Sequence, residues 1–151
     1  KKFQEAVVLY RSILDRCDSE EDRGILELKL CKSLFGVGEY QEASLRLEGF
    51  IKANKKNNRN LVRQAILLNG RCYVQLGELD KALNNFFTLL IEYPRTEEIP
   101  ETNFLAGYCY MLQGNFREAI EVFECLIKTY PESGYSYKAQ NYLFRLDIAR
   151  Q

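Results

Sequence analysis

Apolar side chains recur at intervals of three and four along nearly the whole chain, which is the spacing of amphipathic α-helices. The first stripe passes through Phe3, Ala6 and Tyr10, and the last begins at Tyr135. The period of two that marks half-exposed strands is almost absent. The pattern predicts an all-α fold of eight helices, with the six inner ones at 26–37, 40–51, 66–76, 79–91, 104–112 and 116–127.

One short sequence motif occurs four times within this pattern. It consists of an aromatic residue or leucine, an alanine three positions later, and a second aromatic residue or leucine four positions after that. The alanines are 37, 39 and 37 residues apart, at Ala6, Ala43, Ala82 and Ala119. In the last three copies a glycine lies two residues before the first position of the motif, at Gly38, Gly77 and Gly114. A period of this length predicts stacked pairs of helices, with glycine in the left-handed conformation that ends a helix.

Two other joints read Tyr-Pro-Arg-Thr at 93–96 and Tyr-Pro-Glu-Ser at 130–133. Proline ends the preceding helix, and a hydroxyl that follows it can cap the next one. We therefore expect Thr96 and Ser133 to be helix caps. Pro100 either falls in the first turn of its helix or marks a later start.

The charges of the chain balance, because 21 Lys and Arg residues face 21 Asp and Glu residues. There is thus no net field to attract nucleic acid or an anionic membrane. No apolar run approaches the roughly 18 residues of a membrane span. Histidine is absent, which removes the commonest general acid–base, most metal sites and the His-based triads. We predict no catalytic residue, no metal and no cofactor, and a protein that is not an enzyme.

The cysteines suggest packing rather than chemistry. Their number is odd, no Cys-x-x-Cys spacing occurs, and three of them stand at helix positions that need a small apolar side chain. This usage favours a reducing compartment such as the cytoplasm. The five are Cys17, Cys31, Cys72, Cys109 and Cys125.

The joint at 52–63 differs from the others because it is basic and rich in asparagine. No acidic residue occurs between Glu48 and Glu78, whereas an acidic stretch lies one repeat earlier, at 15–22. The simplest interpretation is that both segments are solvated loops. The alternatives are that the basic loop docks an acidic partner, or that it makes the chain a nucleic-acid adaptor, although the aromatic residues lie at core spacing outside this loop.

Two segments resemble tetratricopeptide repeats (TPRs) at seven positions each. In the first the matching residues are Gly70, Tyr73, Gly77, Leu79, Ala82, Phe86 and Pro94. In the second they are Gly107, Tyr110, Gly114, Phe116, Ala119, Phe123 and Pro131. A weaker copy lacks the proline and has Leu30, Cys31, Leu34, Gly38, Tyr40, Ala43 and Leu47. Where the family prefers tryptophan, the three copies have Glu27, Ile66 and Asn103.

The resemblance implies a right-handed solenoid of antiparallel helix hairpins that forms a single array over residues 1–151. Its parts would be the second helix of a partial repeat at 1–17, repeats at 22–57, 61–96 and 99–132, and a capping helix at 133–151. The period exceeds the roughly 34 residues usual for the family. Together with the Tyr-Pro joints, the long period is similar to a bacterial cell-envelope branch resembling outer-membrane assembly lipoproteins, which would place the protein in the envelope or periplasm.

In this family the first helix of each repeat lines a concave groove that binds a peptide or a helix of another protein. Carried over to this chain, the groove residues are Lys32, Phe35, Gln64, Leu67, Arg71, Glu101, Phe104, Tyr108, Met111 and Tyr142. We expect a non-enzymatic scaffold or adaptor that organises a multiprotein assembly through this groove or through its ends. The alternatives are an accessory segment of a larger enzyme and the nucleic-acid adaptor. The first helix lacks a hairpin mate, so we expect further repeats or a homo-oligomer to cover its apolar stripe.

Overall fold

The structure is a computed structural model that describes residues 2–150, with the side chains of residues 2–147. Its regular structure within these residues is entirely α-helical, which confirms the predicted fold class and the eight helices. None of the described helices is both long and apolar enough to cross a membrane. The helices are α1 (Lys2–Leu14), α2 (Glu20–Val37), α3 (Tyr40–Asn54), α4 (Arg59–Leu76), α5 (Leu79–Glu92), α6 (Ile99–Leu112), α7 (Phe116–Thr129) and α8 (Gly134–Arg150).

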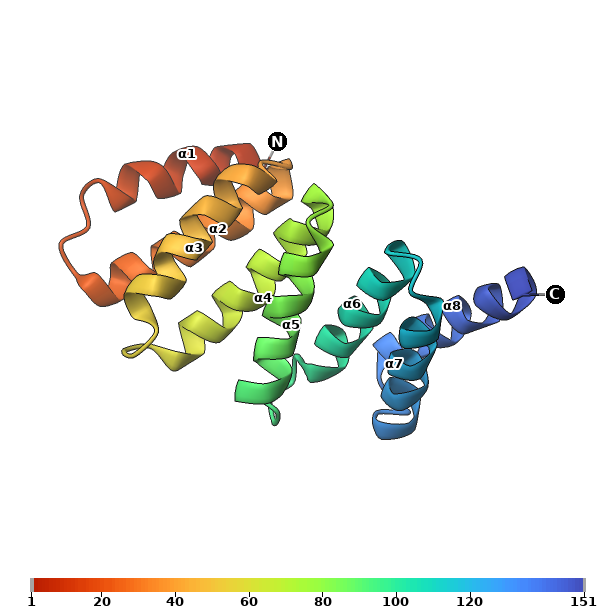
Figure 1. The fold of residues 1–151 in the computed structure, drawn as a ribbon. Coiled ribbons are helices and arrows are strands. Elements are labelled where there is room, and N and C mark those ends of the chain that lie inside the picture. Colours follow the sequence, from red (N-terminus) through yellow and green to blue (C-terminus); the bar gives the residue numbers. More distant parts are fainter. Residues whose placement is uncertain (1, 151) are drawn as a thin grey trace. The chain divides into compact units, whose positions relative to one another are not determined.

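The helices divide between two compact units. The N-terminal unit, residues 1–78, holds α1 to α4 (red to green in Figure 1). The C-terminal unit, residues 79–151, holds α5 to α8.

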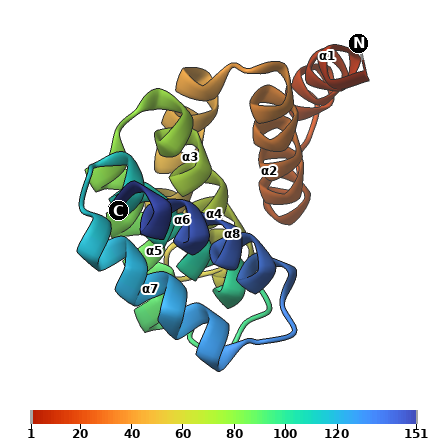
Figure 2. The ribbon, with the colours of Figure 1, turned by 90° about the vertical axis from the view of Figure 1, so that its right-hand side faces the viewer.

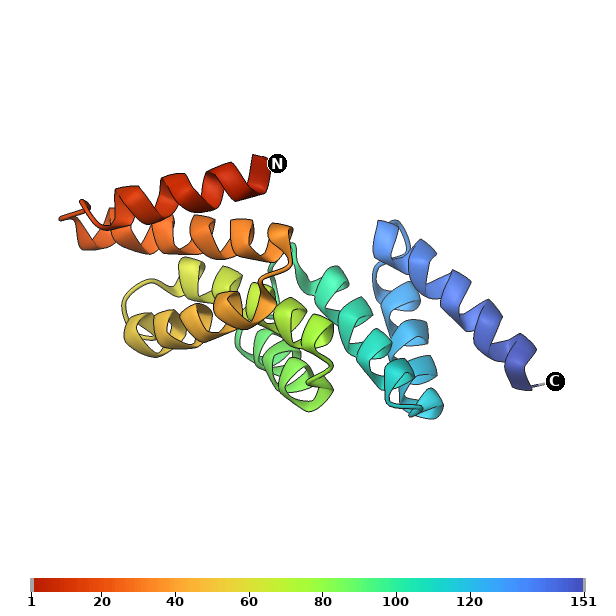
Figure 3. The same cartoon turned by 90° about the horizontal axis from the view of Figure 1, so that it is seen from above.

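In the N-terminal unit each helix packs against the next, and α2 also contacts α4. Figure 3 shows α1 and α2 running side by side. Apolar side chains from all four helices form one core, in which Leu30, Leu34 and Leu47 are fully buried. Burying one such side chain contributes about 1.5–3 kcal/mol, so this core holds the four helices together.

The C-terminal unit follows the same plan. Each helix packs against the next, and α6 also contacts α8; α7 and α8 lie next to each other in Figure 2. Its core is built around Phe123 and Leu126 of α7, with Ala119 and Ala139 fully buried beside them. Because the side chains of these alanines are small, the neighbouring helices approach closely.

Glycines reverse the chain between α2 and α3 and between α6 and α7. Gly38 has a φ of 90° and Gly114 a φ of 78°, a region that residues with a side chain rarely adopt. Beyond Gly38, the N–H of Glu39 donates to the carbonyl of Leu34 at 2.9 Å, which satisfies the end of α2. The short glycine turns predicted from the sequence are therefore present at these two joints.

The proline joints match the prediction at one place and not at the other. Ser133 takes up a capping role, since its hydroxyl accepts a hydrogen bond from a backbone N–H in the first turn of α8 at 3.2 Å. The prediction that Thr96 caps α6 is wrong: its hydroxyl donates to the carbonyl of Tyr93, and α6 begins only at Ile99. Pro100 stands in the first turn of α6, where its missing N–H costs no helical hydrogen bond.

Candidate functional site

The C-terminal unit contains five of the residues predicted to line a groove, namely Glu101, Phe104, Tyr108, Met111 and Tyr142. Phe104, Tyr108 and Met111 follow one another on α6 at intervals of four and three, so they share one side of that helix. Tyr142 comes from α8, which packs against α6. The structure therefore brings side chains from two helices to one surface.

Three of these residues form a cluster of rings that we call the aromatic patch (Phe104, Tyr108 and Tyr142). The centroid of the Tyr142 ring lies 5.8 Å from that of Phe104 and 5.8 Å from that of Tyr108. Phe104 and Tyr108 stack with their centroids 6.3 Å apart. Favourable aromatic pairs have separations of about 4.5–7 Å. Because Phe104 is buried and both tyrosines are half-buried, the patch has an apolar floor with two rings at its surface.

Two cations of α8 accompany these rings. The guanidinium carbon of Arg145 lies 5.8 Å from the centroid of the Tyr142 ring, and the Nζ of Lys138 lies 5.0 Å from that of Tyr135. Both distances suit a cation–π interaction. Both charged side chains are exposed, so the aromatic patch has an apolar centre with positive charge beside it.

The other five predicted groove residues lie in the N-terminal unit and are Lys32, Phe35, Gln64, Leu67 and Arg71. Leu67 is buried, and the other four are half-buried or exposed. The Nζ of Lys32 on α2 donates to Oε1 of Gln64 on α4 at 3.2 Å. The ring of Phe35 instead packs edge-on against Tyr40, with centroids 5.1 Å apart. Leu67 of α4 is only 6% exposed and is therefore not accessible to a partner.

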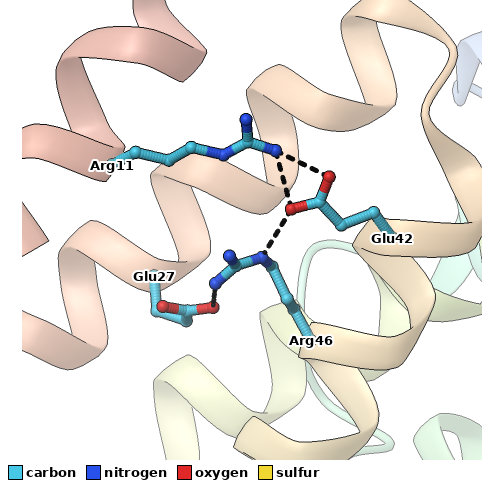
Figure 4. Close-up of polar contacts among 4 residues, drawn as sticks. All are labelled: Arg11, Glu27, Glu42 and Arg46. Atoms are coloured by element: carbon cyan, nitrogen blue, oxygen red, sulfur yellow. Dashed lines mark hydrogen bonds and ion pairs between the residues drawn. The ribbon is translucent and has the colours of Figure 1, made fainter.

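An ion-pair network that the sequence analysis did not single out joins three helices of the N-terminal unit (Figure 4). Arg11 of α1 donates two hydrogen bonds to the carboxylate of Glu42 on α3, at 2.7 and 2.8 Å. Arg46, one turn further along α3, donates to Glu42 at 3.0 Å and to Glu27 of α2 at 2.9 Å. Two cations and two anions alternate, so the charges of the network balance.

The network keeps its central members charged. Partial burial alone would raise the pKa of the Glu42 carboxyl group, but hydrogen bonds from Arg11 and Arg46 outweigh burial and hold this pKa below its ordinary value of 4.5. Burial alone would lower the pKa of Arg46, whereas hydrogen bonds to Glu27 and Glu42 raise it. The network thus links α1 to α3, and α3 to α2, through a Glu42 carboxylate and an Arg46 guanidinium that are both ionised at neutral pH.

A hollow of about 520 Å³ lies between α2 and α3 beside this network. Gly24 and Gly49 line it without side chains, Phe50 is part of its wall, and Glu27 and Arg46 also line it.

The sequence offered one signal for the ion-pair network, since Arg46 follows Glu42 by four residues, the spacing of a helical ion pair. The partners on α1 and α2 could not be identified, because their pairing depends on how the helices pack.

The basic joint at 52–63 is only partly a loop, because residues 52–54 end α3, residues 55–58 form the loop, and residues 59–63 begin α4. Lys52 at the end of α3 and Lys55 and Lys56 in the loop are exposed, but the flanking aromatic residues along the chain, Phe50 and Tyr73, are both buried. Proteins that bind single-stranded nucleic acid combine positive charge with rings on which bases stack. This loop supplies only the charge, which favours the interpretation as a solvated loop over the nucleic-acid adaptor.

Three of the cysteines are buried helix residues with poorly reactive thiols. Burial raises the pKa of Cys31, Cys72 and Cys109 to about 12, and the thiolate is the form that attacks electrophiles or binds metals. Cys125 is exposed on α7. Within residues 2–150 no three Cys, Asp or Glu side chains are grouped closely enough to hold a metal ion.

Comparisons with known proteins address the family directly. The sequence model of the tetratricopeptide repeat family matches residues 101–133. This stretch coincides closely with the repeat predicted at 99–132. No curated protein matches the chain in sequence.

Solved structures resemble the chain over most of its length. A TPR protein from Parabacteroides merdae is 22% identical with a TM-score of 0.72; the match covers 91% of this chain and 51% of that protein, so the chain spans about half of its length. The TPR-like repeats of a putative kinesin light chain from Podosopora anserina are 19% identical with a TM-score of 0.83, covering 98% of this chain and 78% of theirs. YrrB, described as a TPR protein with an unusual peptide-binding site, is 21% identical with a TM-score of 0.75, covering 93% and 66%.

At these identities the likeness shows the fold, which is that of TPR solenoid proteins. The family match and the structural neighbours together support the predicted TPR family. They do not bear on the bacterial cell-envelope branch, which stays a prediction.

Proposed function

We propose that the chain is a non-enzymatic protein-interaction module that binds a peptide segment of a partner and thereby organises an assembly. The observation that carries this proposal is the aromatic patch, in which Tyr108 and Tyr142 stand half-exposed above the buried ring of Phe104. Tyrosine rings lose little side-chain freedom on binding and are over-represented among the residues that dominate interface energy.

The charges beside the patch define the ligand. Arg145 and Lys138 supply two cations, and the patch itself supplies apolar surface. A segment that lays an apolar side chain against the exposed faces of the two tyrosines and places an Asp or Glu within about one turn would satisfy both. The peptide-binding site named for YrrB supports this class of ligand.

Selection from a phage-displayed library of 12-residue peptides tests the proposal. We expect the chain to enrich peptides that combine an apolar anchor with a nearby carboxylate. The affinity of one enriched peptide, measured by fluorescence anisotropy, should fall about tenfold or more in Tyr142→Ala and in Arg145→Glu, which corresponds to about 1.4 kcal/mol or more.

Tyr137→Ala is the matched control, because Tyr137 is an exposed tyrosine of the same helix that does not belong to the patch. Its affinity should equal that of the wild type, and circular dichroism should show unchanged helix content in every variant. Peptides that bind the wild type and Tyr142→Ala equally well would remove the aromatic patch as the site, and a selection without enrichment would argue against peptide binding.

A further inference from the structure

The hollow between α2 and α3 lies where one repeat lacks an apolar residue that the next repeat has. Glu27 of α2 stands 39 positions before Ile66 of α4, which is also the spacing of Ala43 and Ala82 in the recurrent motif. Ile66 is only 6% exposed, so α4 buries an apolar side chain at this place. Glu27 instead accepts a hydrogen bond from Arg46 of α3 at 2.9 Å and lines the hollow. The apolar side chain that the repeat would place here is therefore missing.

Two glycines, one from each helix, leave the hollow wide. A Cβ built on Gly49 of α3 would meet no atom within 4 Å, and one built on Gly24 of α2 would lie at an ordinary van der Waals distance of 3.5 Å from the ring of Phe50. Phe50 also lines the hollow and is 8% exposed, so part of its surface is available to a ligand. The volume of about 520 Å³ falls within the range of about 300–1,000 Å³ that is typical of ligand pockets.

The ion-pair network fixes one wall of the hollow. Arg46 donates to both Glu27 and Glu42, and Arg11 of α1 holds Glu42 in turn (Figure 4). The side chain of Arg46 is therefore tied to α2 as well as to its own helix. A wall that is already ordered loses little freedom when a ligand binds.

Part of the hydrogen-bonding capacity at the hollow is unused. Within the described residues Glu27 accepts a hydrogen bond only through Oε1, so its Oε2 is available to a donor. Arg23 of α2 lines the hollow with an exposed side chain. One of its nitrogens, Nη2, donates to the carbonyls of Leu14 and Cys17 at 3.2 and 3.4 Å, which holds the guanidinium in place. The hollow thus offers an acceptor and a guanidinium plane beside the apolar surface of Phe50.

The charges that line the hollow cancel, because Arg23 and Arg46 are balanced by Glu20 and Glu27. A charged ligand gains no net attraction from such a lining, whereas a neutral group with a hydrogen-bond donor suits it. The indole ring of tryptophan combines an apolar body, the strongest cation–π attraction among the aromatic side chains, and one N–H donor. Phenylalanine lacks the donor, and leucine lacks the ring as well.

We propose that the hollow between α2 and α3 is a pocket for a tryptophan side chain of a partner protein. The indole ring lies against Phe50 and the guanidinium of Arg23, and its N–H donates to Oε2 of Glu27. The pocket belongs to the N-terminal unit and shares no residue with the aromatic patch, so the failure of either proposal leaves the other standing.

The probe for this pocket is N-acetyltryptophanamide, a neutral mimic of a tryptophan residue within a polypeptide. The chain contains no tryptophan, so indole fluorescence reports the probe alone. We expect saturable binding with a Kd on the order of 1 mM, as suits so small a ligand. In competition, N-acetylphenylalaninamide should bind about fivefold more weakly, because it leaves Oε2 of Glu27 without a donor. Free tryptophan should also bind more weakly, because it brings two further charges to a lining without net charge.

Variants of the chain locate the pocket. Gly49→Leu places a side chain in the open space of the hollow and should weaken binding of the probe roughly tenfold or more. Gln41→Leu is the matched control, because Gln41 is an exposed residue of α3 that does not line the hollow, and it should leave the Kd unchanged. Circular dichroism checks the helix content. Should Gly49→Leu unfold, Ala53→Leu fills the hollow from another exposed residue of α3.

The hydrogen bond to the indole ring has a test of its own. Glu27→Gln should weaken binding of N-acetyltryptophanamide about fivefold but leave that of N-acetylphenylalaninamide nearly unchanged. A displaced wall would instead weaken both compounds alike.

Four outcomes would overturn the proposal. The first is the absence of saturable binding, and the second is unchanged binding in both Gly49→Leu and Ala53→Leu. The third is a preference for another ligand: equal binding of the phenylalanine compound would indicate a purely apolar occupant, and tighter binding of free tryptophan would indicate a free amino acid. The fourth is a dimer in sedimentation that Gly49→Leu dissociates, which would make a second copy of the chain the occupant.

Discussion

The hydroxyl of Ser44 on α3 donates a 2.8 Å hydrogen bond to the side-chain oxygen of Asn69 on α4, where both residues are buried. The hydroxyl of Tyr73 donates to the carboxylate of Glu48 across the same pair of helices. Burial, and then the hydrogen bond to Glu48, raises the pKa of Tyr73, so the hydroxyl keeps its proton. Among the described side chains, no buried nitrogen or oxygen lacks a partner. A polar cluster therefore fixes the register of α3 against α4.

Replacing Asn69 tests this cluster. Asn69→Leu should destabilise the chain by about 1–3 kcal/mol, because it leaves the buried hydroxyl of Ser44 without its acceptor. Adding Ser44→Ala removes that hydroxyl and should restore about 1 kcal/mol. Urea denaturation followed by circular dichroism measures both, with the exposed Asn84→Leu as control, expected within about 0.5 kcal/mol of the wild type. Strictly additive effects of the two substitutions would show that the hydrogen bond does not couple them.

Two glycines in helix interiors should respond to alanine with opposite signs. Gly107→Ala gains about 1 kcal/mol of helix propensity, but the new Cβ would lie 2.6 Å from the ring of Phe123. Phe123 is fully buried and its ring lies 5.9 Å from that of Phe104, so it has little room to move. Overpacking of this kind costs about 1–3 kcal/mol, and we expect net destabilisation by up to about 2 kcal/mol.

Gly49 is the matched control for this substitution. A Cβ at Gly49 of α3 would meet no atom within 4 Å, so Gly49→Ala should stabilise the chain by about 0.5–1 kcal/mol. Chemical denaturation of the two variants gives the comparison. If Gly107→Ala proved as stabilising as Gly49→Ala, the ring of Phe123 would not be held as tightly as the structure indicates.

The fold could be predicted from the sequence because its determinants are local and periodic. In each motif the alanine, such as Ala43 or Ala119, follows the first apolar residue by three positions, which specifies a helix. The glycine before the motif specifies the turn. Neither signal requires knowledge of tertiary contacts. The failure at Thr96 shows the limit of this reasoning. Two acidic residues, Ile99 and Pro100 follow it, and the helix begins at Ile99 with the proline in its first turn, because the fixed φ of proline suits that turn.

The candidate site was less accessible to prediction. The resemblance to the family supplied Phe104, Tyr108 and Tyr142 as groove residues, and the first two share one face because they are four apart on a helix. The Arg11–Glu42 pair could not be found, since 31 residues separate the two side chains and nothing in either segment specifies the partner. Likewise Leu67 has the spacing of a groove residue, but its side chain is buried, which the sequence pattern did not indicate.

The cysteines should differ sharply in reactivity. With the pKa of Cys31, Cys72 and Cys109 raised to about 12, their thiolate fraction at pH 8 is on the order of 10³-fold below that of an ordinary thiol. Native protein treated with iodoacetamide should therefore be modified first at the exposed Cys125, and at the three buried cysteines only after unfolding in guanidinium. Peptide mass spectrometry reads out each position. Early modification of Cys109 in the native protein would show that α6 opens far more readily than its packing indicates.

The ion-pair network makes a prediction about pH. Glu42→Gln should destabilise the chain at pH 7 by roughly 1 kcal/mol, because it removes a carboxylate held by Arg11 and Arg46. The folded-state pKa of Glu42 is lowered from 4.5, so below pH 4.5 the unfolded chain takes up this proton before the folded one does, and the stabilisation is lost as pH falls. The difference in Tm between wild type and Glu42→Gln should thus shrink from pH 7 to pH 3.

Glu121→Gln is the control, since the pair of Glu121 with Arg117 is largely exposed, and this substitution should change Tm little at any pH. A Tm difference for Glu42→Gln that stays constant over this range would mean that the carboxylate is not stabilised by the two arginines.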